Sequence, residues 1–192
     1  QKKIKNCVMT KPNFLIVGAP KCGTTALWRY LGEHPDIWLS QQKDLHYFGS
    51  DLNFTQRGRH SEEEYLSFFG EAQGKMIGEA SVWYLYSKNA AGEIFQFDPG
   101  MKIIIMLRDP IKMMYAHYTQ MRFNGLGNED QSSFAAALDK EEARSRGMEL
   151  PSSTPLPEAL LYRKVARYSE QIQRYFKIFP RDQIQIILQE DM

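Results

Sequence analysis

The sequence predicts a three-layer α/β domain with a mostly parallel central sheet flanked by helices. Short apolar runs rich in β-branched residues, at residues 14–17 and 103–107, are typical of strands that are buried on both faces. Between such runs lie stretches whose apolar residues recur at helical spacing, as expected where helices connect parallel strands. The length of 192 residues and the apolar fraction of 43% suit a single domain, 1–192, with one substantial core.

The composition limits the possible partners and compartments. The 24 Lys and Arg residues nearly balance the 23 Asp and Glu residues, so we expect no nucleic-acid partner and only local recognition of anions. Cys7 and Cys22 make no disulfide framework, and a free thiol at Cys22 fits a reducing compartment. No run approaches the roughly twenty apolar residues of a membrane span. We predict a cytoplasmic protein, with a Golgi lumenal domain trimmed of its anchor as the alternative.

The first strand leads into a predicted anion site. The apolar run 14–17 stops at Gly18-Ala19-Pro20, and apolar residues recur at helical spacing from Ala26 to Leu31, ending near His34-Pro35. The loop 18–25 therefore ends at the start of a helix, where unpaired amides and the positive end of the helix dipole attract anions. Lys21 and the hydroxyls of Thr24 and Thr25 add further donors.

The spacing of this loop differs from that of a Walker A loop, in which a lysine directly follows the second glycine. Gly18 and Gly23 have the Walker spacing, but Thr24 occupies the lysine position and Lys21 lies two residues before Gly23. An ordinary nucleotide loop and a structural turn that binds no phosphate are the alternatives at this point.

The pattern P-K-x-G-T-T at residues 20–25, followed by a helix, resembles the phosphosulfate loop of one enzyme family. This family is the sulfotransferases that use 3′-phosphoadenosine 5′-phosphosulfate (PAPS) as sulfuryl donor and release 3′-phosphoadenosine 5′-phosphate (PAP). The resemblance implies a P-loop-like fold and a catalytic role for Lys21. It also implies that the donor is bound by Lys21, Cys22, Gly23, Thr24, Thr25 and Ala26.

A second match follows the apolar run 103–107. Arg108-Asp109-Pro110 ends the predicted strand, because proline cannot continue a ladder and suits the first turn of a helix. Arg108 thus stands at the carboxyl end of a strand, where open α/β sheets bind ligands. The segment resembles the 3′-phosphate motif of the family, which implies that Arg108 binds the donor. Met113 and Ala116 replace the arginine and serine that the family usually has.

The segment Lys43 to Phe48 supplies the candidates for a catalytic base. It follows the short predicted strand Ile37 to Leu39 and resembles the K-E-x-H-[FY]-F motif of glycan-modifying and bacterial members. In an extended segment the carboxylate of Asp44 and the imidazole of His46 can face one cleft. The resemblance implies that Asp44 is the base and His46 its partner, or that His46 is the base. A solvated aspartate beside a half-buried histidine is the alternative.

The remaining elements are predicted from local patterns. Ser61 followed by three glutamates indicates a helix start, and the basic residues Arg57, Arg59 and His60 before it form a solvated loop or contact an anionic substrate. Residues 76–81 indicate a strand, with a helix opening at 82–86; Gly78, Glu79, Ser81 and Tyr84 match the family's G-E-x-S/T-x-x-Y. Ala80 stands where some members carry a catalytic lysine.

The last third of the chain is predicted as a polar segment, a helix and a strand. Residues 124–157 form a mobile flap over the acceptor site or a disordered surface loop. Residues 159–179 indicate one amphipathic helix, and 183–188 a last strand. The family resemblance begins near Asn13 and continues to Met192. The family normally has a further C-terminal section, so the domain 1–192 is predicted to lack it.

These observations predict transfer of a sulfuryl group from PAPS to an acceptor hydroxyl by in-line displacement. A sulfuryl group carries less charge than a phosphoryl group, so Lys21, amides and a base can stabilise its transition state, and we expect no metal. The acceptor is a glycan, a lipid, a small alcohol or a carrier-bound acyl group. A P-loop nucleotide kinase or NTPase, with residues 103–109 as its Walker B strand, and a non-catalytic nucleotide-binding module are the alternatives.

Overall fold

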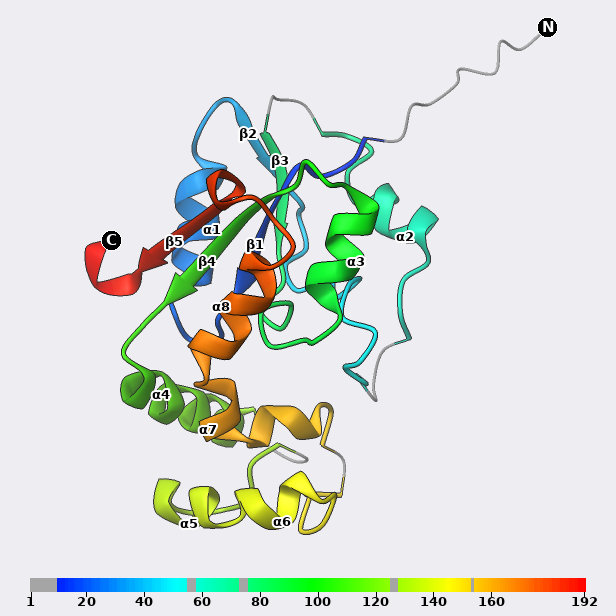
Figure 1. Cartoon of the computed structure of the whole chain (residues 1–192). Coiled ribbons are helices and arrows are strands. Elements are labelled where there is room, and N and C mark those ends of the chain that lie inside the picture. The colour runs from blue at the N-terminus through cyan, green and yellow to red at the C-terminus, as the bar shows by residue number, and fades with distance from the viewer. Residues whose placement is uncertain (1–9, 55–57, 73–75, 125–127, 153) are drawn as a thin grey trace, which may run out of the picture.

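Five parallel strands form the centre of the molecule (Figure 1). The computed structural model describes residues 10–54, 58–72, 76–124, 128–152 and 154–192. The strands lie in the order β2-β3-β1-β4-β5, and every neighbouring pair is parallel. Their bounds are β1 (Phe14–Gly18), β2 (Ile37–Leu39), β3 (Met76–Ala80), β4 (Lys102–Leu107) and β5 (Ile184–Leu188). The predicted three-layer, P-loop-like α/β fold is confirmed.

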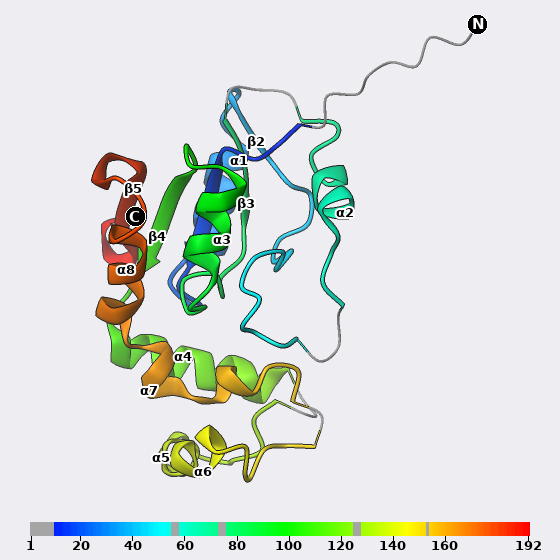
Figure 2. The same cartoon turned by 45° about the vertical axis from the view of Figure 1, so that its right-hand side comes forward.

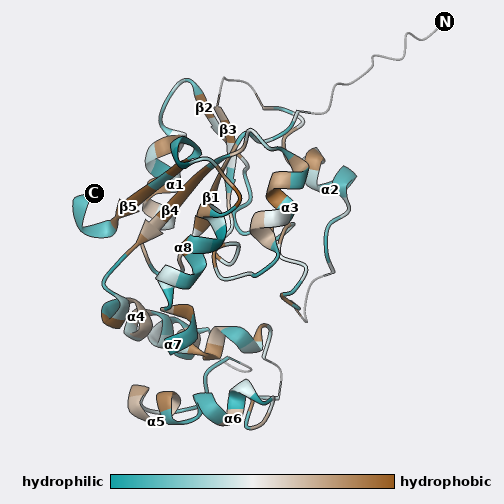
Figure 3. Cartoon of the chain, in the orientation of Figure 1, coloured by the Kyte–Doolittle hydropathy of each residue, from teal (hydrophilic) through white to brown (hydrophobic). Residues whose placement is uncertain are grey.

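The central strand β1 explains why its sequence is a continuous apolar run. It pairs with β3 on one edge and β4 on the other, so that Leu15 aligns with both Glu79 and Ile103. All five of its residues are buried, as expected for a strand covered on both faces. Figure 3 shows the same concentration of hydrophobic residues along the strands.

Helices cover both faces of the sheet. Figures 1 and 2 show α1 (Thr24–Gly32) on one face, and α3 (Ala90–Phe97) and α8 (Tyr168–Phe176) on the other. Ile94 of α3 and Tyr175 of α8 belong to the same buried cluster as Ile16 and Ile105 of the strands. The other helical segments are α2 (Glu62–Ser67), α4 (Pro110–Phe123), α5 (Phe134–Asp139), α6 (Glu141–Ser145), η1 (Pro157–Leu160), α7 (Tyr162–Val165), η2 (Arg181–Gln183) and η3 (Gln189–Asp191). In the described ranges, no helix is both long enough and apolar enough to cross a membrane.

Two predicted helix starts are confirmed by their capping hydrogen bonds. Ser61 and Glu64 form a reciprocal capping box at the start of α2. At α4 the Asp109 side chain accepts from the amide of Lys112 at 2.8 Å, and Pro110 takes the first helical position. The strand end that contains Arg108 is therefore joined directly to a rigid helix.

The helix predicted at residues 82–86 is wrong, because these residues form turns and α3 begins only at Ala90. The amide of Val82 donates to the Asp44 side chain, and the amide of Leu85 donates to the carbonyl of Val17. The amide of Leu85 would pair within a helix that starts at Val82, but it bonds to β1 instead, whereas the amide of Val82 would have no partner inside such a helix. The buried Ser87 side chain accepts from the amide of Ala90, which starts α3 instead.

The single helix predicted at residues 159–179 is also wrong. The structure divides it into η1, α7 and α8, because the backbones of Leu161 and Arg167 have ψ angles of 67° and 62°, outside the helical region. The buried Gln171 side chain donates to the carbonyls of Lys164 and Val165 at the end of α7. A polar side chain thus satisfies the carbonyls that a continuous helix would have paired internally.

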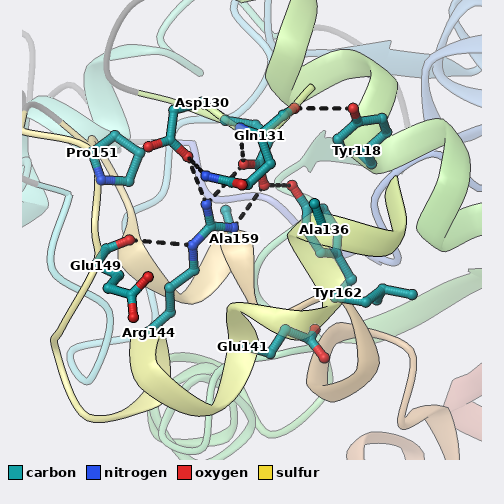
Figure 4. A network of polar contacts seen from close by, with 12 residues as sticks. Tyr118, Asp130, Gln131, Ala136, Glu141, Arg144, Glu149, Pro151, Ala159 and Tyr162 are labelled. Carbon is teal, nitrogen blue, oxygen red and sulfur yellow. Dashed lines mark hydrogen bonds and ion pairs between the residues drawn. The ribbon is translucent and has the colours of Figure 1, made fainter. Parts of the chain in front are cut away.

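Residues 128–152 are held in place by a buried ion pair (Figure 4). The Arg144 guanidinium donates to both carboxylate oxygens of Glu129, at 2.7 and 2.8 Å, and both side chains are fully buried. The Tyr162 hydroxyl donates to the same carboxylate at 2.6 Å, and Asp130 contacts the guanidinium at 2.9 Å. The disordered-loop alternative is therefore wrong for these residues, while a role as a cover for the acceptor stays a prediction.

Replacement of Arg144 by Met should destabilise the fold strongly. Glu129 would remain buried without its cation, and breaking a buried pair in this way typically costs about 3 to 5 kcal/mol. The matched control is Arg146→Met, which breaks the exposed pair with Glu142 nearby and should cost less than about 1 kcal/mol. Urea unfolding measures both losses, and equal losses would contradict a structural role for the buried pair.

Candidate active site

The loop between β1 and α1 leaves the start of a helix open to a ligand. Gly23 is the N-cap residue of α1, with a φ of 86°, and no side chain caps this end. Gly18 also has a positive φ, and a Cβ there would lie 2.6 Å from the carbonyl oxygen of Val82. Both positions therefore require glycine, and the nine-residue helix α1 presents its first amides to an anion.

A cavity of about 410 Å³, here called the loop cavity, joins most of the predicted site residues. Lys21, Gly23, Thr24 and Thr25 line it from the loop, and Arg108 lines it from the end of β4. Asp44 reaches it from the segment that follows β2. Residues that lie far apart in the sequence thus meet at the carboxyl edge of the sheet, as predicted for ligand binding in open α/β sheets.

A hydrogen bond links the side chain of Lys21 to α4. Its ammonium donates to the side-chain carbonyl of Gln120 at 3.0 Å. The side-chain NH2 group of Gln120 in turn donates to the side-chain oxygen of Asn124 at 2.6 Å. Lys21 itself has a left-handed backbone, with a φ of 58°. Loop and helix therefore fix the position of the ammonium together.

Two predicted donor-binding residues do not present side chains to the loop cavity. The Cys22 thiol is buried, donates to the carbonyl of Pro20 at 3.4 Å and lies 3.5 Å from the Tyr168 hydroxyl. Burial raises the pKa of this thiol to about 11, so Cys22 stays protonated, and it is free as expected. Ala26 is not among the lining residues. Cys22 and Ala26 can therefore contact a ligand in the loop cavity only through their backbone atoms. Cys7 lies outside the described residues.

The segment with Asp44 and His46 is not extended, contrary to the prediction. Both residues have left-handed backbones, with φ angles of 60° and 52°. The amide of Asp44 donates to the carbonyl of Ala80, and its carboxylate accepts from the amide of Val82 at 3.2 Å and from the Lys43 ammonium at 3.1 Å. These bonds to β3 and the following turn impose the conformation.

Asp44 and His46 are placed differently with respect to the cavities. A second cavity of about 410 Å³, the outer cavity, shares Asp44, Trp83 and Met121 with the loop cavity. His46 lines only the outer cavity and a neighbouring hollow near Arg59 and His60. Its ring stacks on Phe54, with centroids 4.3 Å apart. Asp44 therefore stands at the junction of the two cavities, and His46 lies on the outer side.

Sequence reasoning missed the residues that α4 and the end of β5 contribute. His117 and Gln120 line the loop cavity from α4, and Gln189 lines it from just beyond β5. His117 Nε2 donates to the carbonyl of Ala159 at 2.9 Å, and burial lowers the pKa of His117 to about 4, so the ring is neutral. His117, Gln120 and Met121 are spaced so that they lie on one face of a helix, and this spacing could have identified that face of α4 as part of the cavity lining.

Met113 and Ala116 give no substitute for the family's arginine and serine. Met113 is fully buried in the core, and neither residue lines the loop cavity. Of the residues that line this cavity, Arg108 alone carries a guanidinium. The cationic groups that face the cavity are therefore Lys21, Lys43 and Arg108.

Behind the segment 44–48 lies a carboxylate with an unusual environment. Glu79 is completely buried and accepts hydrogen bonds from the hydroxyls of Tyr84 at 2.7 Å, Ser81 at 2.9 Å and Tyr65 at 3.3 Å. Burial raises the pKa of Glu79 to about 7, against the opposing effect of these hydroxyls. A strongly shifted carboxyl group that interacts electrostatically with a candidate site residue, here Asp44, is typical of a functional site.

Comparisons with known proteins point to one family. No protein-family profile matches the chain. A solved structure, a sulfotransferase from Alicyclobacillus acidocaldarius, matches with a TM-score of 0.82 at 35% identity, over 95% of this chain and 74% of that one. Human carbohydrate sulfotransferase 15 is 32% identical over 56% of this chain, and human bifunctional heparan sulfate N-deacetylase/N-sulfotransferase 3 is 30% identical over 92%.

Fold and site together define an α/β protein with an uncapped helix start and a cavity at the carboxyl edge of a parallel sheet. Given its 35% identity to the bacterial structure over most of both chains, the chain belongs to the sulfotransferase family. This confirms the predicted resemblance to the sulfotransferases, while the roles of the site residues stay predictions. The chain spans 27% and 20% of the lengths of the two human relatives.

The pH dependence of stability should reveal Glu79. Between its ordinary pKa of 4.5 and its folded pKa of about 7, the folded protein holds a proton that the unfolded chain has lost. The free energy of unfolding should therefore fall as the pH rises through this window, by roughly 3 kcal/mol from this group. In the Glu79→Gln variant this contribution is absent, so the stability of the wild type relative to the variant should decline from pH 4.5 to 7.

The titration of His117 changes the free energy of unfolding in the opposite direction, so its contribution must be separated from that of Glu79. Because its pKa falls from 6.5 to about 4, the stability it provides is lost as the pH drops through that range. Both proteins contain His117, so its contribution cancels in the difference between them. Urea unfolding at several pH values from 4 to 8 gives this difference, and a flat difference would contradict the shifted pKa of Glu79.

Proposed function

We propose that this chain transfers a sulfuryl group from PAPS to an acceptor hydroxyl by in-line displacement. The observation that carries the proposal is the loop cavity, where the uncapped start of α1, Lys21, Arg108 and Asp44 meet. Amides at a helix start, hydroxyls and cations suit the oxygens of a phosphosulfate. Membership of the sulfotransferase family supports the same chemistry.

The donor would supply the activated sulfuryl group, and the chain's own residues bind and orient it. The first amides of α1 and the hydroxyls of Thr24 and Thr25 hold the 5′-phosphosulfate, and Arg108 holds the 3′-phosphate. Lys21 stabilises the negative charge that grows on the leaving oxygen. To reach that oxygen, its ammonium shares or releases the hydrogen bond to Gln120.

Asp44 is the better candidate for the catalytic base. It lies at the junction of the two cavities, where a hydroxyl in the outer cavity can meet a group held in the loop cavity. His46 lines only the outer side and orients the acceptor. A base must lie within hydrogen-bond reach of the proton that it removes, and the position of Asp44 meets this condition more simply.

The acceptor carries a hydroxyl group and occupies the outer cavity. Asn124 and Asn128 offer polar groups there, while Trp83 and Leu156 offer apolar surface. Glycan, lipid, small alcohol and carrier-bound acyl group are all compatible with this lining. The names of the two human relatives refer to carbohydrate and to heparan sulfate, so carbohydrates are the first class to test.

The alternatives are a P-loop kinase or NTPase and a non-catalytic nucleotide-binding module. Thr24 at the Walker lysine position and the family assignment both argue against the first. Within the described residues, no three His, Cys, Asp or Glu side chains are grouped as ligands for a metal ion. The cytoplasmic location, with the Golgi lumen as alternative, stays a prediction, as does the single domain 1–192.

Thermal unfolding with PAP should test the donor site. At a hundredfold its dissociation constant, PAP should stabilise the protein by about 2.7 kcal/mol and raise the melting temperature by about 5 to 10 °C. Arg108→Met should reduce this shift, whereas Arg181→Met, at the opposite end of β5, should preserve it. A larger shift with Mg-ATP than with PAP would favour the kinase alternative and overturn the proposal.

Paired substitutions should identify the base. With a carbohydrate acceptor that the wild type sulfates, Asp44→Asn should lower turnover about 10² to 10⁴-fold while PAP affinity stays unchanged. Asp36→Asn, a change of the same kind before β2, is the matched control. Loss of turnover in His46→Gln alone would make His46 the base. Nearly full activity in both variants would show that neither residue removes the proton.

A further inference from the structure

The segment 44–48 is tied to the sheet through hydroxyl groups that all meet at Glu79. The amide of His46 donates to Ser81 Oγ at 3.1 Å, and the amide of Tyr47 donates to the Tyr84 hydroxyl at 2.9 Å. Each of these hydroxyls in turn donates its own proton to Glu79, at 2.9 and 2.7 Å. Two chains of hydrogen bonds therefore run from the backbone of the segment to a single buried carboxylate.

The third hydroxyl at Glu79, that of Tyr65, serves as a comparison for those of Ser81 and Tyr84. Tyr65 also donates to the carboxylate, at 3.3 Å, but it contacts the segment through its ring, which stacks on Tyr47 with centroids 4.1 Å apart and meets Phe48 edge-on. Tyr65 thus shares the carboxylate without belonging to either chain of hydrogen bonds that ends at a backbone amide of the segment.

The direction of these hydrogen bonds depends on the carboxylate. Above a pH of about 7, where Glu79 is ionised, its carboxylate only accepts, so the Ser81 and Tyr84 hydroxyls must both donate to it, and their oxygens are left to accept from His46 and Tyr47. A carboxamide at position 79 would place a donor against one of the two hydroxyls and reverse its direction. The charge of Glu79 therefore dictates which way the whole network points.

The segment needs such an anchor because of its backbone. Asp44 and His46 both adopt left-handed conformations that non-glycine residues rarely occupy, and such conformations persist only where surrounding contacts impose them. These are also the two residues whose side chains line the junction and the outer cavity. Small changes in this backbone would redirect both side chains.

We propose that Glu79 is a positioning residue, which through Ser81 and Tyr84 fixes the backbone of residues 44–48 and so aims Asp44 and His46. The assignment of a catalytic role to those two side chains rests on the proposed function. The anchoring of the segment itself rests only on the hydrogen bonds around Glu79.

Backbone amide exchange, followed by NMR on the full chain, tests the anchoring directly. Relative to core amides of β1 and β4, Ser81→Ala should speed exchange at His46, and Tyr84→Phe at Tyr47, each at least tenfold. At a pH above about 7, Glu79→Gln should speed exchange at the one amide whose hydroxyl faces the carboxamide NH2 group. Tyr65→Phe is the matched control, because it removes a hydrogen bond to the same carboxylate and should leave both rates near those of the wild type.

A second readout separates positioning from general stability. With desulfated heparin as acceptor probe, Glu79→Gln should lower kcat at least tenfold while the dissociation constant of PAP stays within about twofold. Ser81→Ala combined with Glu79→Gln should cost little more than either alone, because both act through one chain of hydrogen bonds.

Three outcomes decide the matter. Protection of His46 and Tyr47 in Glu79→Gln equal to that in the wild type would overturn the proposal, as would the same loss of protection in Tyr65→Phe as in Tyr84→Phe. If the wild type sulfates no acceptor but the exchange pattern appears as expected, the proposed function fails, while the anchoring of residues 44–48 by Glu79 is supported.

Discussion

The position of β1 between β3 and β4 is the constraint on which the site depends. Because β1 bonds to a neighbour on each edge, its carboxyl end is where loops from both halves of the sheet come together. The chain can turn there only without a side chain at Gly18, since the carbonyl of Val82 fills the space. The loop between β1 and α1, the end of β4 with Arg108, and the turn after β3 are thereby brought together.

Two buried carboxylates show how differently the molecule treats negative charge. Glu129 faces the Arg144 guanidinium and ties α6 to Tyr162 of α7, which is a structural use of an ion pair. Glu79 meets only hydroxyls, so its charge lacks a cation, and burial raises its pKa to about 7. A protein optimised for stability alone would gain from an apolar residue at such a position. Glu79 therefore lowers the stability of the fold. We propose that it is kept because it sets the direction of the hydrogen bonds of Ser81 and Tyr84 next to the candidate site.

The sequence predicts those features whose causes are local. The strand 14–17, the glycine-bounded loop and the capped start of α4 each follow from neighbouring residues, and the strand ends point to Lys21, Asp44 and Arg108. The helix predicted at 82–86 failed because the distant carbonyl of Val17 takes the amide of Leu85. The helix predicted at 159–179 is divided where the side chain of Gln171, within the same segment, takes the carbonyls of Lys164 and Val165. His117 and Gln120 were missed because only the packing of α4 across the sheet edge decides which of its faces lines the cavity.

The charges in the loop cavity show how a carboxylate could stand beside the anionic donor that we propose. Met113 of α4 packs into the core, and the face of α4 that reaches the cavity carries the neutral His117 and Gln120 instead of a further cation. The cations come from Lys21, Lys43 and Arg108, and Lys43 lies 3.1 Å from the carboxylate of Asp44. Under the proposed function, that ion pair reduces the repulsion between Asp44 and an incoming phosphosulfate. Lys21 and Arg108 would then be left to bind the anion, so that anion binding and proton removal are separated within one site.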